Sequence, residues 1–223
     1  MFTTHDGSIS LKCPRFDEAY HSKFGAAGES RHVFVEGGLQ EWYRLQPKRN
    51  RELQLFEMGF GTGLNAIFAL QWAEDLQRPV VYHSIDLFPL SEEQLNALNH
   101  VDFIDEDLHE EVKKIQHGEW NKPLKISPYF TLHKQQISLL DIDLPDDFYD
   151  VVFFDAFSPG TQPELWTEDV FRKIFTAARK KAVLVTYCAK GDVRRTLRAA
   201  GFDVEKVPGP PGGKREMTRA KKR

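Results

Sequence analysis

Three acidic residues are the strongest candidates for chemistry in this sequence, because each follows directly on a run of mostly apolar residues. They are Glu57, Asp86 and Asp155. Apolar runs of this length indicate buried strands, and the carboxyl ends of parallel strands meet at one edge of a sheet. Carboxylates at such an edge can accept hydrogen bonds from ribose hydroxyls or take a proton from a reacting group. We therefore expect the three acids to share one crevice.

The stretch 53–65 reads as a strand, a turn and the start of a helix. The turn carries Gly59, Gly61 and Gly63, with a glycine at every second position. Glycine lets the backbone adopt positive φ and lets a ligand approach without a Cβ in the way. The free N–H groups at a helix start then face that ligand. The pattern predicts a nucleotide-type pocket.

The spacing of the glycines indicates which ligand to expect. A dinucleotide fingerprint needs a glycine where Leu64 stands, and the lysine of a phosphate-binding loop is missing. S-adenosylmethionine (SAM) has no pyrophosphate and suits such a loop. We expect the loop at Glu57 to receive its charged amino acid end, Asp86 to accept from its ribose, and Asp155 to stand beside the reacting methyl. There a carboxylate can deprotonate an amine and stabilise the positive charge that its nitrogen gains.

The elements that must position these residues alternate between strand and helix patterns, which predicts an α/β fold. We expect a Rossmann-like SAM-dependent methyltransferase fold, with a mostly parallel sheet, a C-terminal antiparallel strand and an N-terminal extension. The expected strands are 53–59, 80–86, 129–133, 151–154, 182–188 and a closing pair, 202–207 and 216–221. The whole chain, 1–223, is predicted to be a single methyltransferase domain, with an N-terminal lead-in over 1–50 and the core over 51–223.

Three segments outside these strands carry further expectations. The lead-in is predicted to hold two helices, 29–34 and 39–43, after a flexible Gly25–Gly28, and to cap the open edge of the pocket. The charged stretch 101–128 reads as an insertion with one exposed helix. The acidic loop 141–150 matches no calcium-binding pattern and is expected to be solvated turn surface.

Composition limits the classes of partner. The chain has 223 residues, 41% hydrophobic and 28% charged, with a net charge of −3, so any nucleic acid must bind to a local basic patch. Lys214 and Arg215 stand in a glycine- and proline-rich loop expected near the crevice, where they could hold a phosphate backbone. Two widely spaced cysteines predict free thiols in a cytoplasmic protein. The apolar runs are too short to span a membrane, and no metal-ligand spacing is present.

Motifs along nearly the whole chain resemble the methyltransferase half of the bacterial tRNA-modifying enzyme MnmC. The matching pieces are Phe16-Asp17, Tyr20–Ser22, Glu29–Phe34, Phe56–Asn65, Phe88–Leu90, Asp155–Pro159, Pro163–Trp166, Thr186-Tyr187 and Gly213–Met217. The resemblance implies methyl transfer from SAM to the aminomethyl group of 5-aminomethyl-(2-thio)uridine at the wobble position, with the anticodon stem-loop of tRNA as partner.

The resemblance also implies residue roles. Asn65 would join the cofactor site, and the substrate-binding residues would be Tyr20, Ser22, Phe157 and Tyr187. Where the family often has Gly-Asp after the third strand, this chain has two glutamines, which lack the acid, and Gln136 could still hydrogen-bond to the adenine edge. Two-domain members of the family continue into an FAD-dependent oxidase, and no flavin is expected for this chain.

Two other classes of function remain open on the residues alone. One is a methyl- or aminopropyl-transferase acting on small amines, which would turn over free amines or polyamines in place of tRNA. The other is a non-catalytic protein that binds tRNA or a nucleotide and yields no methylated product. A dehydrogenase is disfavoured by Leu64.

Overall fold

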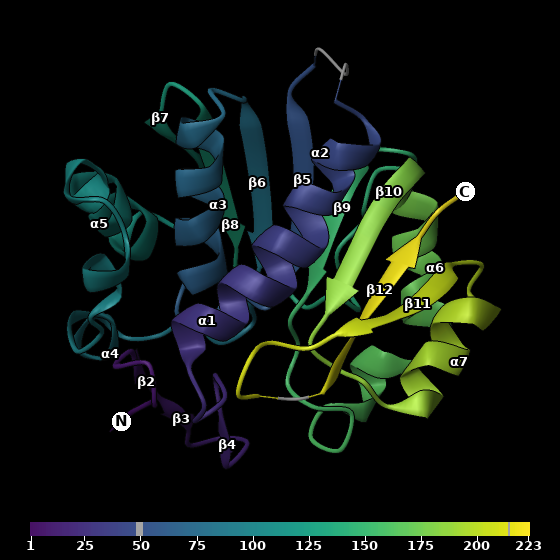
Figure 1. Cartoon of the computed structure of the whole chain (residues 1–223), viewed down its shortest axis with the longest axis horizontal. Coiled ribbons are helices and arrows are strands. Elements are labelled where there is room, and N and C mark those ends of the chain that lie inside the picture. Colours follow the sequence, from purple (N-terminus) through teal and green to yellow (C-terminus); the bar gives the residue numbers. More distant parts are fainter. Residues whose placement is uncertain (48–50, 214) are drawn as a thin grey trace.

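The computed structural model of the chain describes residues 1–47, 51–213 and 215–223. Within these residues, helices cover both faces of a central sheet of eight strands (Figure 1). In spatial order the strands are β11 (Asp203–Pro208), β12 (Glu216–Lys221), β10 (Ala178–Thr186), β9 (Tyr149–Phe154), β5 (Leu53–Met58), β6 (Val80–Ile85), β8 (Phe130–Gln135) and β7 (Pro123–Ser127). The predicted α/β, Rossmann-like architecture is confirmed.

The five inner strands, β10, β9, β5, β6 and β8, are parallel. Strand β9 is buried at every position, as expected of a central strand whose two faces are both covered. The carboxyl ends of these strands meet at the lower edge of the sheet in Figure 1. The residues that follow β5, β6 and β9 therefore come together there.

The two ends of the sheet are antiparallel. Strand β12 runs antiparallel to both β10 and β11, which confirms the predicted closing pair. At the other end, β7 pairs antiparallel with β8 inside the stretch that the sequence indicated as an irregular insertion. In β7 only Ile126 is buried, and the strand begins at Pro123, which an edge strand tolerates. Its weak hydrophobic alternation explains why the pattern did not reveal it.

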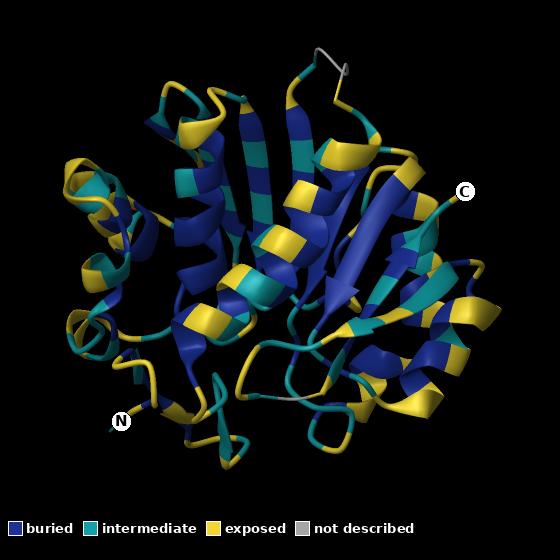
Figure 2. Cartoon of the chain, in the orientation of Figure 1, coloured by how far each residue is buried: buried dark blue, intermediate teal, exposed yellow. Residues whose placement is uncertain are grey.

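Helices form a layer on each face of the sheet (Figure 1). The N-terminal helical segment, α3 and α5 cover one face, and α6 and α7 cover the other. The bounds are α1 (Ala26–Ser30), the π-helix η1 (Arg31–Gln40), α2 (Glu41–Leu45), α3 (Leu64–Asp75), α4 (Glu92–Asn96), η2 (His100–Phe103), η3 (Glu106–Leu108), α5 (His109–His117), η4 (Pro163–Trp166), α6 (Glu168–Ala177) and α7 (Gly191–Ala199). Figure 2 shows their inward sides buried and their outward sides exposed.

The N-terminal lead-in differs from its prediction. Residues 26–45 form one continuous helical segment of α1, η1 and α2, in place of two helices after a flexible start. Two glycines in η1 let this segment lie close to the sheet: a Cβ at Gly37 would come within 2.5 Å of Met217, and one at Gly38 within 2.9 Å of Phe153. The lead-in therefore packs on the sheet. The assignment of 1–223 to a single domain, divided at residue 50, stays a prediction.

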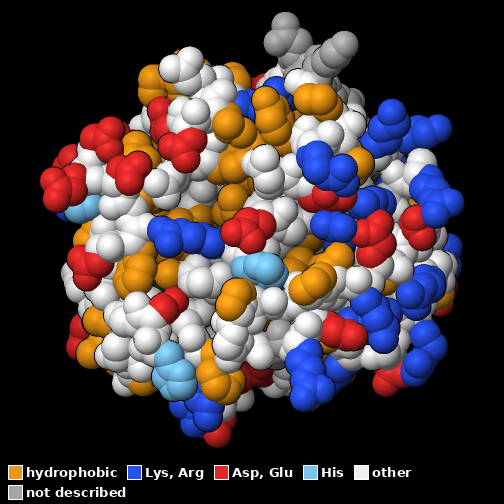
Figure 3. Space-filling model, in the orientation of Figure 1, with side chains coloured by type: hydrophobic (Ala, Val, Ile, Leu, Met, Phe, Trp, Pro, Cys, Tyr) orange, Lys and Arg blue, Asp and Glu red, His pale blue; other side chains and the backbone are white. Residues whose placement is uncertain are grey.

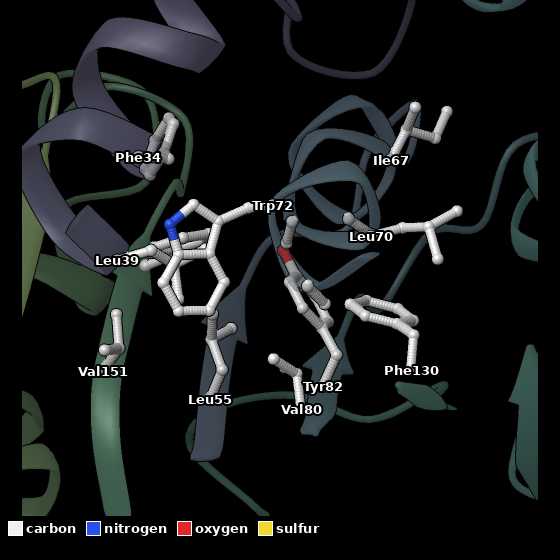
Figure 4. Close-up of a cluster of buried hydrophobic side chains, with 14 of the residues drawn as sticks. Phe34, Leu39, Leu55, Ile67, Leu70, Trp72, Val80, Tyr82, Phe130 and Val151 are labelled. Carbon is white, nitrogen blue, oxygen red and sulfur yellow. The ribbon is translucent and has the colours of Figure 1, made fainter. Parts of the chain in front are cut away.

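The core on the α3 side joins the helices to the strands (Figure 4). In this view Trp72 of α3 lies above Leu55 of the sheet, and Leu70 of α3 lies above Phe130. Burying each large apolar side chain stabilises the fold by about 1.5–3 kcal/mol. This packing fixes α3, and with it the turn that leads into the helix.

The acidic loop 141–150 is not solvated throughout. Asp150 is the second residue of β9 and is buried. Its carboxylate accepts hydrogen bonds from the backbone N–H of Gln54 at 3.1 Å and from Arg179 at 3.0 Å, and it pairs with Arg51. A carboxylate with so many donors tolerates burial that an unpaired one would not.

The N-terminal residues before α1 form four short strands. They are β1 (Phe2–Thr3), which pairs with β2 (Ile9–Ser10), and β3 (Lys12–Cys13), which pairs with β4 (Glu18–Ala19). The β3–β4 hairpin lies at the edge where the parallel strands end (Figure 1). No helix in the described ranges is long and apolar enough to cross a membrane.

Candidate functional site

The glycine turn between β5 and α3 forms the floor of a pocket. Gly59, Gly61 and Gly63 have φ of 94°, 52° and 79°, the left-handed region that favours glycine. A Cβ at Gly59 would lie 2.5 Å from the carbonyl oxygen of Asp155, so the turn and the end of β9 touch backbone to backbone. The sequence predicted these conformations, and the close contact explains why Gly59 has no side chain.

Asp86 fixes the turn from the neighbouring strand. One carboxylate oxygen accepts from the N–H of Gly61 at 2.9 Å, and the other accepts from the N–H of Phe88 at 2.8 Å. Burial raises the pKa of Asp86, and the two N–H donors oppose that rise. Each carboxylate oxygen can accept more than one bond. Asp86 can therefore hold the glycine turn and still accept from ligand hydroxyls.

The pocket lies above this floor and has a volume of about 290 Å³. Nine of the described residues that the sequence singled out line it: Tyr20, Ser22, Gly59, Gly61, Asn65, Asp86, Asp155, Phe157 and Tyr187. Their roles stay predictions. The structure brings them together from the N-terminal hairpin and the ends of four strands, β5, β6, β9 and β10.

Four of the predicted site residues that the structure describes do not line the pocket. Gln136 is exposed and donates to the carbonyl of Leu87 at 3.5 Å, and Arg215 is exposed in the loop before β12. Neither lines the pocket, nor do Glu57 and Gly63. Lys214 lies outside the described residues.

Glu57 lies beneath the pocket, where it contacts protein groups. Its side chain is 0% exposed. It accepts hydrogen bonds from Ser84 Oγ at 2.6 Å and from Asn65 Nδ2 at 3.0 Å. Burial raises the pKa of Glu57 to about 7, and the bonds from Ser84 and Asn65 limit that rise. Glu57 is therefore buried beneath the pocket and contacts Asn65, which lines it, and its predicted role at the cofactor stays a prediction.

Asn65 links the buried floor to the pocket wall. Its Nδ2 also donates to Asp155 Oδ2 at 2.8 Å, and its Oδ1 accepts from Ser30 Oγ at 2.5 Å. Asn65 and Ser30 are 5% and 2% exposed. With two carboxylates facing the NH₂ group and a hydroxyl facing the oxygen, the amide has one favourable orientation. The side chain of Asp155 is therefore held by a chain of buried polar groups that ends at Ser30 of α1.

The β3–β4 hairpin and the residues after it form the outer wall, which the sequence indicated only through Tyr20 and Ser22. Glu18 accepts hydrogen bonds from Ser158 Oγ at 3.0 Å and from Thr161. This ties the hairpin to the loop after β9. Glu18 and Ser158 are far apart in the chain, so no local pattern could have predicted the contact.

Three aromatic rings that are tilted to one another line part of the pocket. The ring of Phe157 lies 5.0 Å from that of Phe16 and 5.2 Å from that of Tyr20. Phe157 is held at its backbone, since its N–H donates to Gln162 at 3.1 Å and its carbonyl accepts from Trp166 at 2.8 Å. Rings at these distances can accept a planar ligand by stacking.

The charge of the pocket wall suits cationic groups. Among the described lining residues, Glu18, Glu29, Asp86 and Asp155 are carboxylates and none is lysine or arginine. His21 also lines the pocket, and burial lowers its pKa to about 4, which keeps the ring neutral at pH 7. No group of three or more metal-binding side chains lies together in the part of the chain that the structure describes.

Fold and pocket together define a Rossmann-like enzyme of the SAM-dependent methyltransferase class. A family model described as S-adenosyl-L-methionine-dependent methyltransferase matches residues 102–223, more than half of the chain. The chain belongs to this family. The glycine turn whose Cβ positions must stay open, and Asp86 beneath it, fit SAM as the cofactor.

More particular relatives are similar in sequence along nearly the whole of this chain. The chain is 36% identical over 220 residues to the tRNA 5-methylaminomethyl-2-thiouridine biosynthesis bifunctional protein MnmC of Cupriavidus metallidurans, covering 93% of this chain and 32% of that protein. It is 33% identical to the MnmC of an Azoarcus species, covering 92% of this chain and 33% of that protein. The chain thus spans about a third of the length of these relatives.

Solved structures give the same picture. MnmC2 from Aquifex aeolicus matches with a TM-score of 0.73 and 25% identity, covering 98% of this chain and 68% of that chain. Spermidine synthase from Thermotoga maritima matches with a TM-score of 0.56 and 11% identity, covering 96% and 69%. The second likeness concerns the fold alone.

Proposed function

We propose that this methyltransferase transfers the methyl group of SAM to the primary amine of 5-aminomethyl-(2-thio)uridine at the wobble position of tRNA. The observation that carries the proposal is Asp155, a carboxylate on the pocket wall that Asn65 holds from below at 2.8 Å. The names of the MnmC relatives, which refer to 5-methylaminomethyl-2-thiouridine in tRNA, support the same substrate.

When bound, SAM supplies an electrophilic methyl on a positively charged sulfur. A free aminomethyl group has an ordinary amine pKa near 10, so it is mostly protonated at neutral pH and has no lone pair for attack. Asp155 binds this cation, accepts a proton directly or through water, and holds the neutral amine in line with the methyl. Once that proton has passed to solvent, the ionised carboxylate of Asp155 stabilises the positive charge on the product nitrogen.

The other lining residues have supporting roles in this proposal. Phe157 and Tyr20 stack on the planar uracil ring, and Ser22 and Tyr187 border the substrate side of the pocket. Gly59, Gly61, Asn65 and Asp86 receive the cofactor. Glu57 supports the cofactor site by holding Asn65. Gly63 supports it by allowing the backbone shape of the turn.

The RNA backbone must bind outside this acidic pocket. Lys and Arg side chains gather on the side of the molecule that carries β11, β12 and α7 (Figure 3). The loop between β11 and β12, which contains Arg215, lies at the same edge as the pocket (Figure 1). We propose that Lys214 and Arg215 contact phosphates of the anticodon stem-loop. A tRNA substrate places the reaction in the cytoplasm.

Nucleoside mass analysis tests the proposal. tRNA that carries 5-aminomethyl-(2-thio)uridine is incubated with the protein and SAM, digested and analysed. A mass gain of one methyl on that nucleoside is expected, and none on unmodified uridine. Methylation of free amines or polyamines in place of tRNA would indicate a small-molecule transferase. Binding of SAM and tRNA with no methylated product would indicate a non-catalytic protein.

A further inference from the structure

An exposed arginine, Arg15, lies against aromatic residues that line the pocket. Arg15 lies in the turn between β3 and β4, and the carbon of its guanidinium group is 4.1 Å from the centre of the Phe88 ring. The same carbon is 6.0 Å from the centre of the Phe16 ring. Both phenylalanines line the pocket. Arg15 is therefore positioned by the pocket wall while its side chain remains exposed.

The charge of Arg15 is not used within the described part of the protein. None of the carboxylates described there forms an ion pair with Arg15. The neighbouring Lys12 pairs with Asp17 at 2.5 Å across the same turn. The hairpin thus presents one cation that is paired and one that is held only against aromatic rings.

The rings beneath Arg15 continue into the pocket. The centre of the Phe88 ring lies 6.0 Å from that of Phe16, and the centre of the Phe16 ring lies 5.0 Å from that of Phe157. A planar ring bound against Phe88 or Phe16 would therefore lie close to Arg15. If that ring is a uracil within an RNA strand, the phosphodiesters on either side of it remain at the rim.

Arginine stacked on an aromatic ring is well suited to such a phosphate. The guanidinium carbon lies 4.1 Å from the centre of the Phe88 ring, and the exposed side chain has N–H groups that can donate to phosphate oxygens. Proteins read single-stranded RNA loops with aromatic and arginine planes. The carboxylates of the pocket would repel a phosphate. A cation beside the pocket supplies the positive charge that a phosphate needs.

We propose that Arg15, supported by Phe88, binds the phosphodiester next to the wobble uridine in the anticodon loop. This inference rests on the proposed function, because it takes the target uridine to be the group inside the pocket. It gives the N-terminal hairpin a second role. The hairpin closes the pocket and also holds the RNA strand at the point where the nucleotide enters.

The test compares variants on an anticodon stem-loop that carries 5-aminomethyluridine. Arg15→Ala should raise the KM for this RNA by roughly threefold to tenfold, the effect of one phosphate contact combined with stacking. The slope of log affinity against log salt should fall by about 0.7, the value for one phosphate of a single strand. SAM affinity, measured by calorimetry, should stay at the wild-type value. Arg15→Lys keeps the charge and should restore the salt slope with incomplete recovery of KM.

Lys12→Ala is the matched control, since it removes one positive charge from the same hairpin at a cation already paired with Asp17. It should leave the RNA KM and the salt slope nearly unchanged. An unchanged KM and salt slope in Arg15→Ala would overturn the inference. So would an equal loss in Lys12→Ala, or a parallel loss of SAM affinity in Arg15→Ala. If the wild-type protein did not methylate the RNA at all, the proposed function would fail first.

Discussion

The side-chain amide of Asn65 donates a 2.8 Å hydrogen bond to Asp155 Oδ2, and it does so from beneath the pocket. The same NH₂ group donates to Glu57 Oε1 at 3.0 Å. One neutral side chain thus separates two carboxylates, of which one lines the pocket and the other is buried. The residue proposed for catalysis and the residue at the end of β5 are therefore coupled through Asn65.

Replacement of Asp155 by asparagine should reduce turnover far more than cofactor binding. Asp155→Asn keeps the size of the side chain but removes the charge that binds and deprotonates the amine. We expect kcat to fall by roughly 10²–10⁴-fold, the range of a positioned acid–base group, with SAM still bound. In the wild-type protein the single-turnover rate should rise with pH as the amine loses its proton. Near-normal turnover of the variant on aminomethyluridine tRNA would contradict the role.

Ser30 should affect the reaction without touching the ligands. Ser30→Ala removes the donor to Asn65 Oδ1, which is worth about 0.5–1.5 kcal/mol, and lets the amide reorient beneath Asp155. We expect kcat to fall by roughly threefold to tenfold, with a smaller change in the KM for RNA. Ser127→Ala is the control, because Ser127 donates to Glu74 at the far edge of the sheet. If both variants lost stability alone and kept kcat, Ser30 would have only a structural role.

Glu57 should make stability depend on pH. Burial raises its pKa from the ordinary 4.5 to about 7, so the folded protein favours the protonated form. This contribution to the free energy of unfolding is complete below pH 4.5 and is lost as pH rises through 7. The shift corresponds to a loss on the order of 3 kcal/mol. Urea unfolding between pH 4.5 and 8 should show this decline in wild type relative to Glu57→Gln, and identical pH dependence of the two proteins would count against it.

Replacement of Gly59 by alanine should destabilise the protein more than the same replacement at a glycine with similar φ but free space around it. In Gly59→Ala the new Cβ would meet the backbone oxygen of Asp155 at 2.5 Å, and neither backbone can move without displacing the pocket floor. Gly7→Ala is the matched control: its φ of 87° resembles the 94° of Gly59, but its Cβ would meet nothing within 4 Å. We expect Gly7→Ala to cost about 1 kcal/mol and Gly59→Ala clearly more, with loss of SAM binding. Thermal unfolding and calorimetry give both quantities, and equal effects would refute the close contact.

Local signals were sufficient for the parallel core. Apolar runs ending in Asp86 and Asp155, and glycines at alternate positions after β5, predicted three strand ends at one edge, and the structure has them there. These predictions held because burial on both faces and positive φ each demand particular residue types at particular places. Strand β7 had no such signal, since an edge strand buries little.

The place of Glu57 could have been derived from the alternation of side chains along β5. Leu53 and Leu55 point to the face covered by α3, and Glu57 follows at the same period of two. It therefore points under α3 to Asn65 and Ser84. The sequence interpretation included Glu57 in the strand 53–59 but did not use this alternation to predict its burial.

The sequence by itself determined the sheet, the glycine turn and the acids that follow its strands, because each depends on neighbours within a few residues. Only the tertiary structure decided what encloses the pocket. The contact of Glu18 with Ser158 joins residues far apart in the chain, and the hydrogen bond from Ser30 to Asn65 depends on how the N-terminal helical segment packs on the sheet. Such contacts join segments that are far apart in the chain, so neither periodicity nor a local motif could predict them.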